Sequence, residues 1–393
     1  MILKKILGIS TLNLIAQILP FAFLPVLTRL YSVQDFGLLA VYMSLVLILT
    51  AVSTFRLEYC LYEDNSDIAK SRVATIVLFV CSISVLIIGA YDLLNDVNLI
   101  YYSIAIVSYL QAICNVEICS LTVTGQLKKI GYANIVRTAT LVGFQTGFYY
   151  ITDIQDHGLV YGFLGSTVCY YLYLNRGYLY QPNILETTAF LSKYSHIVKY
   201  SFPGGLLNIF AGNVPQLILP LYFTMTDLGF YSLAQRILGA PAALIGTAIG
   251  QIYSNDAIKE YKDKKNIRTT FIRFLKYLLA IGMLLFVVLA LIIEDVVRMF
   301  LDPKWSELAR YTVVLMPYFF VNFVVSALCT TDMIIKKNYL YLLLNSGLIL
   351  SNLSYFLIFE SYIFSQYLYY LVLSYSFFYV MYLVSCAILT KEK

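Results

Sequence analysis

Long apolar runs, separated by short polar segments, follow one another along the whole chain. Each run holds about 20 residues, which is the length that an α-helix needs to cross the hydrocarbon core of a bilayer. The runs predict twelve spans, at residues 6–28, 36–55, 73–94, 98–123, 131–151, 158–175, 198–223, 229–253, 272–293, 309–331, 338–359 and 362–389. The expected fold class is therefore all-α, a polytopic membrane protein with twelve transmembrane helices.

Two stretches of the chain repeat the same pattern. In the first, TLNLIAQILPFAFLPVL, and in the second, LLNIFAGNVPQLILPLY, two prolines lie five residues apart inside an apolar run. Each stretch is followed by an Asp-x-Gly motif, which begins at Asp35 in one case and at Asp227 in the other. Such a repeat indicates two homologous halves. We expect an N-terminal six-helix lobe at residues 1–180, a cytoplasmic linker at 181–197 and a C-terminal six-helix lobe at 198–393, related by pseudo-symmetry.

The placement of the basic residues predicts the orientation in the membrane. Most of the 27 Lys and Arg residues fall in segments that lie on one side if the N-terminus is cytoplasmic. Only Arg29, Arg298, Lys304 and Arg310 fall in the segments on the other side. Because cytoplasmic loops carry the excess of positive charge, we expect a bacterial inner-membrane protein with both termini in the cytoplasm.

Composition excludes several classes of function. The chain is 60% hydrophobic and only 12% charged, unlike a soluble domain. The polar segments are too short to form an enzymatic domain, and the sequence has no phosphate-binding loop of the kind that powers ATP-driven pumps. Its seven cysteines and two histidines lack the spacing of metal ligands. We therefore expect no enzymatic activity, no cofactor, no metal and no nucleic-acid partner.

The stretch from Tyr200 to Gln251 combines membrane-spanning length with residues that lipid-facing helices avoid, among them four prolines, several amides and an arginine. Irregular or polar helices are tolerated at membrane depth where they are buried in protein or line a cavity. The pattern predicts that this hairpin lines a cavity. Its candidate substrate-binding residues, with those of the first span, are Arg236, Asn208, Gln216, Gln235, Asn13 and Gln17. Close helix packing with hydrogen bonds between helices is the other interpretation of the amides.

Three of the charged residues that lie within predicted spans are candidates for a role in transport. A permanent charge in the middle of a span is expensive and tends to face the interior of a bundle, so Arg236 is expected to face an anionic substrate. Arg137 lies near the predicted cytoplasmic end of its span, from which it can reach either a cavity or the membrane interface. Glu117 is a candidate for binding a coupling ion or for pairing with one of the arginines.

Several segments resemble those of the O-antigen and polysaccharide flippases of the multidrug/oligosaccharidyl-lipid/polysaccharide exporter superfamily. They are LPVLTRLYSVQDFGLLAVYMSLVLIL, FRLEYCLYEDNSDIAK, YSLAQRILGAPAALIGTAIGQIYSNDA and FLDPKWSELARYTVVLMPYFF. The resemblance implies two six-helix lobes around a central cavity. It also implies transport of an undecaprenyl-pyrophosphate-linked oligosaccharide across the inner membrane for O-antigen, capsule or exopolysaccharide assembly. Membrane lipid and polysaccharide polymerase machinery are the further partners that it suggests.

Three alternatives stay open at the level of sequence. An ion-coupled drug or cation antiporter of the same fold would use buried acidic residues, whereas the charge in the middle of the second-half hairpin is basic. A membrane polysaccharide polymerase would have large outward loops, and the outward segments here are short. A membrane scaffold without transport activity would have little use for a polar core. The tyrosines of the last span, finally, indicate helix packing and interface belts or, less simply, a sugar-stacking surface.

Overall fold

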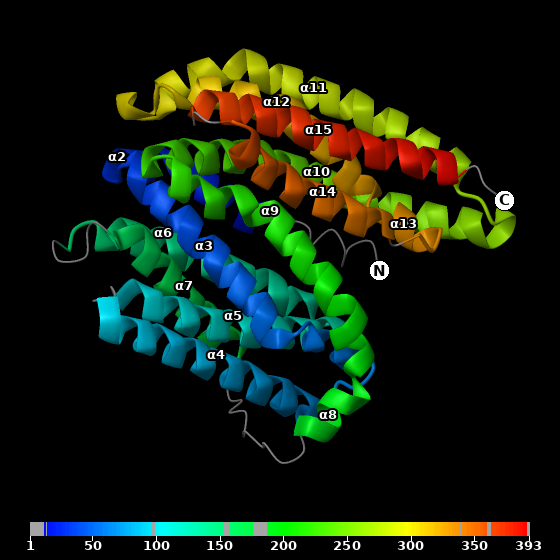
Figure 1. Ribbon diagram of the computed structural model, residues 1–393, viewed down its shortest axis with the longest axis horizontal. Helices are drawn as coiled ribbons and strands as arrows, with labels where there is room; N and C mark the ends of the chain where they lie inside the picture. The colour runs from blue at the N-terminus through cyan, green and yellow to red at the C-terminus, as the bar shows by residue number, and fades with distance from the viewer. Residues whose placement is uncertain are drawn as a thin grey trace. The chain divides into compact units, whose positions relative to one another are not determined.

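The structure is a computed structural model, and it describes residues 12, 14–95, 99–151, 157–175, 187–337, 339–359 and 363–390. These residues form an all-helical fold (Figure 1). Among them, nine helices are long and apolar enough to cross a membrane. Two shorter apolar helices, Leu14–Leu30 and Gly158–Leu174, and the helix α6 (Leu127–Phe148) account for the remaining predicted spans. The chain is therefore a multi-pass membrane protein, and the predicted all-α class is confirmed.

The chain divides into two compact units, Met1–Ile209 and Phe210–Lys393. The dividing point lies inside helix α9 (Phe202–Tyr222). The predicted lobe boundaries at residues 180 and 198 stay a prediction. They were based on the sequence repeat, whereas these two units are defined by which residues contact one another.

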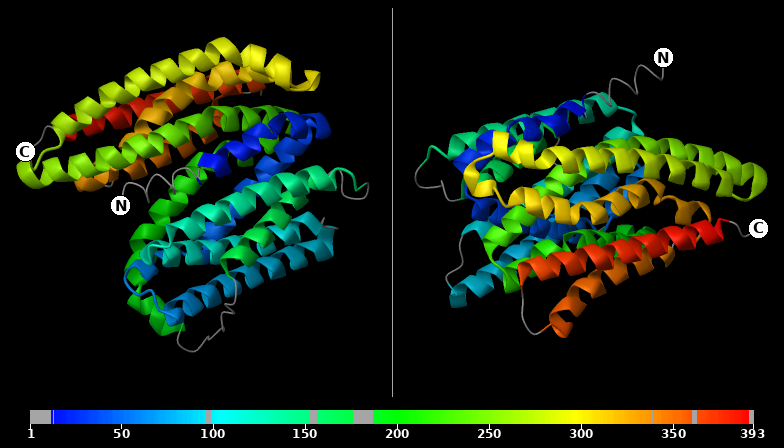
Figure 2. Two further views of the ribbon diagram at one scale, coloured as in Figure 1. Left: turned by 180° about the vertical axis from the view of Figure 1, so that it is seen from behind. Right: turned by 90° about the horizontal axis from the view of Figure 1, so that it is seen from above.

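Unit 1 is a helical bundle centred on α5. Its elements are α2 (Leu24–Leu30), α3 (Val33–Thr54), η1 (Leu57–Tyr62), α4 (Asp67–Asn95), α5 (Leu99–Val123), α6, α7 (Gly158–Leu174), α8 (Thr187–Lys193) and a π-helical turn, η3 (Ile197–Ser201). Helix α5 contacts α3, α4 and α7, and α6 packs along α7 (Figures 1 and 2). The short helix η1 turns under the bundle, where Leu57, Cys60 and Leu61 are buried in a core with residues of α4 and α5. The apolar sides of these helices thus face one another within the unit.

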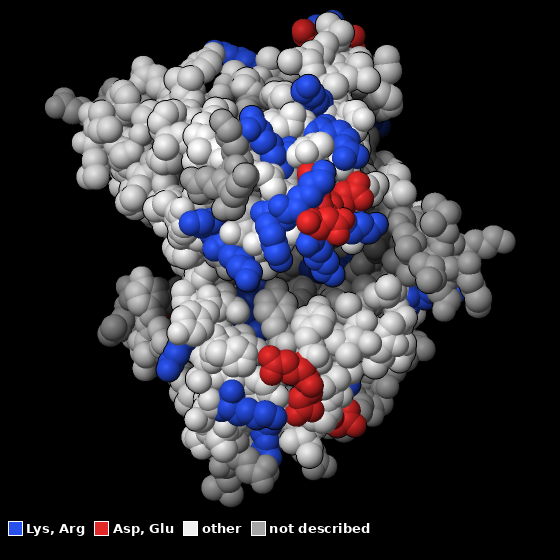
Figure 3. Space-filling view, turned by 90° about the vertical axis from the view of Figure 1, so that its right-hand side faces the viewer, with Lys and Arg blue, Asp and Glu red and all other residues white. Residues whose placement is uncertain are grey.

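Unit 2 is built around α12. Its elements after α9 are α10 (Met225–Lys264), α11 (Arg268–Phe300), η4 (Pro303–Trp305), α12 (Leu308–Leu328), α13 (Thr331–Ile334), α14 (Tyr339–Ile358) and α15 (Phe364–Leu389). Helix α12 contacts α10, α11 and α15, and α14 packs on α15. Helices α10 and α11 exceed their predicted spans, because their polar ends continue as helix beyond the apolar run. In Figure 3, basic side chains gather over the end of α10 and the beginning of α11, which carry Lys259, Lys262, Lys264, Lys265 and Arg268.

Helix α9 runs without interruption through Pro215 and Pro220, although an interior proline removes a backbone hydrogen bond. The carbonyl that Pro215 leaves without its helical donor is that of Ala211, four residues earlier. The hydroxyl of Tyr375, on α15, donates to this carbonyl oxygen at 3.4 Å. A neighbouring helix therefore satisfies the freed group, which is how prolines are tolerated inside membrane helices.

The tyrosines of α15 take part mainly in packing within unit 2. Tyr367, Tyr375 and Tyr382 are buried. Tyr367 donates a hydrogen bond to Asn352 Oδ1 on α14 at 2.7 Å, and Asn352 Nδ2 donates to the Tyr375 hydroxyl at 2.5 Å. Buried hydroxyls with partners on a neighbouring helix favour the helix-packing interpretation for Tyr367 and Tyr375.

Candidate functional site

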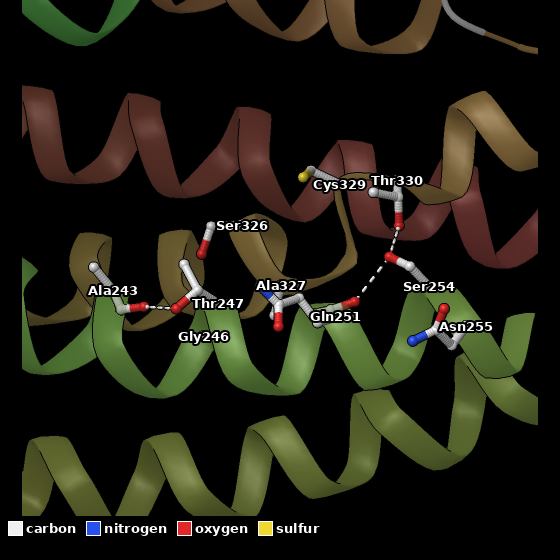
Figure 4. Close-up of a pocket in the computed structure, with 11 residues that line it drawn as sticks. Ala243, Gly246, Thr247, Gln251, Ser254, Asn255, Ser326, Ala327, Cys329 and Thr330 are labelled. Carbon is white, nitrogen blue, oxygen red and sulfur yellow. Dashed lines mark hydrogen bonds between the residues drawn. The ribbon is translucent and has the colours of Figure 1, made fainter. Parts of the chain in front are cut away.

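A polar pocket of about 600 Å³ lies in unit 2, between α10 and the end of α12 (Figure 4). Its lining is rich in hydroxyl and amide side chains and in small residues. The lining residues are Ala243, Gly246, Thr247, Gly250, Gln251, Ser254, Asn255, Ser326, Ala327, Cys329 and Thr330. The hydroxyl and amide side chains among these residues can bind a polar ligand.

Small residues on α10 create the space for this pocket. Gly246 and Gly250 lie one turn apart on one side of the helix, in the spacing that lets membrane helices approach closely. A Cβ atom added to Gly250 would lie 3.0 Å from the carbonyl oxygen of Ala327 on α12. Since the obstacle is backbone, a side chain at Gly250 would push the two helices apart.

Hydrogen bonds hold part of the lining in place. The hydroxyls of Ser254 and Thr330 lie 2.8 Å apart, and that of Ser254 also donates to the Gly250 carbonyl at 2.8 Å (Figure 4). The side chains of Gln251 and Asn255 are exposed at the pocket. Hydroxyls and amides both donate and accept hydrogen bonds, so the arrangement suits a ligand with many hydroxyl groups. Of the described lining residues, Cys329 alone carries a titratable group, so these residues offer no acid–base pair.

Two of the predicted site residues meet directly. Gln216 Nε2, on α9, donates a hydrogen bond to Gln235 Oε1, on α10, at 2.5 Å. Gln216 is only 5% exposed, and its own Oε1 has no hydrogen-bond partner among the described residues. The pair fits the packing interpretation of the amides, since it joins neighbouring helices, and it also leaves one buried acceptor unused.

Arg236 follows Gln235 on α10 and is partly exposed. Ala243, the first residue of the polar pocket, lies seven residues further and therefore on the same side of the helix. With a rise of 1.5 Å per residue, the two positions are roughly 10 Å apart along the axis. Arg236 and the pocket thus share one face of α10.

The other predicted residues of α9 and of the first span are spread out. Asn208 is exposed on α9, two turns before Gln216. Gln17 is exposed in the helix that begins the described part of the chain. Asn13 lies outside the described residues. Unit 2 brings Gln216 and Gln235 together.

The predicted charged residues of unit 1 occupy neighbouring helices. The Arg137 guanidinium, on α6, lies over the rings of Tyr170 and Phe163, on α7, at 5.1 and 5.8 Å from their centroids. Glu117, on α5, is 7% exposed. Arg137 thus contacts aromatic faces, a favourable arrangement for a guanidinium.

Sequence reasoning missed most of the polar pocket. The predicted span ended at residue 253, so Ser254 and Asn255 were expected in a cytoplasmic loop. The signal was nonetheless present, because Thr247, Gln251 and Ser254 continue the helical spacing of the small residues before them. Ser326 and Thr330 carry no such signal, since isolated hydroxyls are common in membrane helices.

Several solved structures of membrane transport proteins share this fold. The chain is similar to the lipid II flippase MurJ in an inward closed conformation, with a TM-score of 0.78 and 14% identity over 98% of this chain and 88% of that one. It is also similar to an inward-facing multidrug resistance MATE family transporter of the MOP superfamily, with a TM-score of 0.65 and 12% identity over 96% and 94%. It is similar as well to the D35N mutant of the MATE transporter VcmN of Vibrio cholerae, with a TM-score of 0.60 and 12% identity over 99% of this chain and 96% of that one. At identities of 12–14%, these similarities show the fold.

Sequence comparisons give the family. Comparison with curated protein sequences gives no significant match. The sequence pattern of the family described as polysaccharide biosynthesis protein matches residues 26–310, which is most of the chain. The match covers both copies of the Asp-x-Gly motif and all of the α10 residues that line the pocket. The chain therefore belongs to the polysaccharide biosynthesis protein family.

Proposed function

We propose that this protein is a flippase that moves an undecaprenyl-pyrophosphate-linked oligosaccharide across the inner membrane for O-antigen, capsule or exopolysaccharide assembly. The observation that carries the proposal is the pocket of hydroxyl and amide side chains on α10 and α12, in a member of the polysaccharide biosynthesis protein family. A lipid-linked oligosaccharide has a glycan with many hydroxyls, which suits such a pocket. The similarity in fold to MurJ, a lipid II flippase, supports a lipid-linked substrate.

In this proposal, Arg236 binds the pyrophosphate and the amide and hydroxyl side chains bind the glycan. A guanidinium presents a fork of donors that matches phosphate oxygens, and Arg236 lies on the same face of α10 as the pocket. Gln216, Gln235, Asn208, Asn13, Gln17 and Arg137 are the further candidates for substrate contact, and Glu117 is the candidate for a coupling ion. The hydrocarbon tail of the substrate stays in lipid, because only the polar part needs a hydrated path.

Transport would proceed by alternating access of the two predicted lobes, 1–180 and 198–393, with both termini in the cytoplasm. Repeats that enter the membrane from the same side are related by an axis along the membrane normal. Rocking of one lobe against the other would then expose the site to each side in turn. The polysaccharide polymerase machinery is the proposed receiver of the translocated unit.

The proposal is tested by complementation of a flippase-deficient strain with Arg236→Ala and Arg236→Lys. Loss of a hydrogen bond to a charged group weakens binding by about 1.5–3 kcal/mol. We therefore expect Arg236→Ala to lose most surface polysaccharide and Arg236→Lys to retain part of it. Surface glycan is measured with the amount of protein in the membrane fraction.

Arg298→Ala is the matched control. Arg298 lies at the end of α11, where its side chain is 78% exposed and pairs with Glu294 at 3.3 Å. Removing it should leave export unchanged, because exposed ion pairs contribute little. Full export by Arg236→Ala at normal abundance would contradict the role of Arg236. Restored drug resistance in a susceptible strain, without restored polysaccharide, would favour the antiporter instead.

A further inference from the structure

An apolar crevice of about 840 Å³ lies in unit 1, between α4 and the segment that contains α8 and η3. Its walls include Leu78, Phe79 and Ile83 of α4, and Leu191 and Val198 of the opposite segment, and Lys199 lies at its edge. All of its lining residues belong to unit 1. None of them is a candidate for contact with the transported substrate.

The crevice opens onto the side of α4 that faces hydrocarbon. Phe79, Leu86 and Ile87 are 65%, 71% and 64% exposed along this helix, which is a candidate membrane span. Large apolar side chains in such positions are lipid-facing in a membrane protein. A hollow that continues this surface is filled by hydrocarbon at no penalty, whereas water in it would find few hydrogen-bond partners.

The opposite wall has the features of a segment at the membrane interface. Helix α8 has seven residues, which is too short to cross a bilayer, and none of them is buried. Phe190 and Leu191 pack against the core of unit 1, while Thr187 and Thr188 are among the residues that line the crevice. An amphipathic segment beside the end of a span lies at headgroup depth.

Among the described residues beside the crevice, two lysines have ion pairs and Lys199 has none. Lys193 pairs with Asp64 at 3.7 Å, and Lys70 pairs with Asp67 at 3.6 Å. Lys199 is exposed at the edge of the crevice, and no ion pair of this residue is present in the described part of the chain. An anion placed at the mouth of the crevice would therefore meet an available ammonium group, with the Ser195 hydroxyl close by.

We propose that this crevice binds an anionic glycerophospholipid, with an acyl chain between α4 and α8 and the phosphate beside Lys199. The apolar walls select a hydrocarbon chain and the lysine selects a negative headgroup. The site is separate from the proposed transport site, since it uses none of the same residues. It would anchor the segment after residue 186 to the membrane surface and to α4.

The experiment measures lipid retention by the purified full-length protein in native mass spectrometry. Delipidated protein is titrated with phosphatidylglycerol and, separately, with phosphatidylcholine of the same acyl chains. We expect the wild type to retain phosphatidylglycerol in preference. Lys199→Gln should weaken phosphatidylglycerol binding by about fivefold, the effect of one lysine near an anionic surface, and leave phosphatidylcholine binding unchanged.

Two further variants complete the test. Lys193→Gln is the matched control, because it removes a lysine of the same segment that does not line the crevice and whose charge is already paired, and it should bind as the wild type does. Leu191→Trp narrows the crevice and should reduce binding of both lipids. Circular dichroism and unfolding temperature confirm that each variant folds.

Equal binding of the two lipids by the wild type, or wild-type binding by Lys199→Gln, would overturn the proposal. Displacement of phosphatidylglycerol by undecaprenyl phosphate at lower concentration than by phosphatidylglycerol itself would also overturn it. That result would assign the crevice to the isoprenoid chain of the transported lipid.

Discussion

Helices α3 and α10, which follow the two proline-containing runs of the repeat, start with the same hydrogen bonds. In α3, the Ser32 hydroxyl donates to Asp35 at 2.7 Å and accepts from the Asp35 backbone at 3.3 Å. In α10, Thr224 and Asp227 make the same pair of bonds at 2.7 and 3.2 Å. The repeat seen in the sequence is thus repeated in local structure at the start of both helices.

The two helices then diverge. With Asp35 placed on Asp227, the partly exposed Arg236 corresponds to Ser44, which is 2% exposed and donates to the Ala40 carbonyl at 2.9 Å. Gly246 corresponds to Thr54, the last residue of α3. Helix α3 stops there because Phe55 and Arg56 take left-handed backbone conformations, with φ of 48° and 60°. Helix α10 continues to Lys264 and reaches roughly 60 Å in length.

Most of the α10 residues that line the pocket lie in the part of the helix that α3 lacks. The same asymmetry holds before the Asp-x-Gly motif. With Pro20 placed on Pro215, Phe21 corresponds to Gln216, and with the Asp residues aligned, Met43 corresponds to Gln235. Two apolar residues in one copy thus correspond to a hydrogen-bonded pair in the other. The two copies therefore start their helices alike, whereas the arginine, the hydrogen-bonded glutamines and the pocket residues of α10 belong to the second copy.

We expect the largest loss of stability when the arginine of the second copy is introduced at the corresponding position of the first copy. Ser44→Arg would place a guanidinium where the structure buries a small hydroxyl, and a buried charge without a partner costs about 3–5 kcal/mol. We expect little folded protein in the membrane fraction. The measurement is abundance together with the apparent unfolding temperature in detergent.

Arg236→Ser, the reverse exchange, is the control for this variant. It removes a charge from a partly exposed position and should accumulate at nearly the wild-type level, even though export is expected to fall. Normal abundance and stability of Ser44→Arg would show that the two positions are equivalent, against the asymmetry described above.

The glutamine pair should give an intermediate and unequal effect. Gln235→Met leaves the buried Gln216 amide without its acceptor, while Gln216 Oε1 already has no described partner, so we expect a loss of about 1–3 kcal/mol. Gln216→Met removes the Nε2 donor and the unused Oε1 acceptor together, so no buried polar atom of residue 216 is left without a partner. We therefore expect this variant to lose less stability than Gln235→Met. The measurement is the apparent unfolding temperature of each single variant and of the double variant.

The double variant has apolar residues at both positions, as the first copy has at Phe21 and Met43. It should be nearly as stable as Gln216→Met. Met is used because it has a similar length and little shape preference. Equal losses from the two single variants would indicate that the unused oxygen of Gln216 has a partner in the membrane.

Much of this fold follows from the chain's apolar pattern. Every predicted span that falls on described residues corresponds to a helix, because a run of about 20 apolar residues has few alternatives in a membrane. Helix ends were less predictable, as at Lys264, because polar residues beyond the membrane extend a helix without leaving a hydrophobic signal. The uninterrupted course of α9 depends on Tyr375, which is far away in sequence.

The candidate site was predicted only in part, for a related reason. Periodicity along one helix places Arg236, Gly239, Ala243 and Gly246 on a common face. It does not say which helix packs against that face, so the contribution of Ser326 and Thr330 from the end of α12 could not be foreseen. The pairing of Gln216 with Gln235 likewise depends on how α9 and α10 are rotated about their axes. Sequence patterns describe single helices well and their partners poorly.

The smallest expected effects concern the shared start of α3 and α10. Asp35→Ala and Asp227→Ala each remove the carboxylate that accepts from the backbone and hydroxyl of the residue three positions earlier. Such a loss costs about 1 kcal/mol at a helix N-terminus, and the negative charge there also favours the helix dipole. Because the two sets of bonds are alike, we expect equal decreases of about 2 °C in the unfolding temperature. Asn at either position keeps an acceptor without the charge and should lower the unfolding temperature by about half as much.

The contrary outcome is a decrease in unfolding temperature for Asp227→Ala that is several times the decrease for Asp35→Ala, with export lost as well. It would mean that the second copy's motif also serves transport and that the copies differ from their first turn onward.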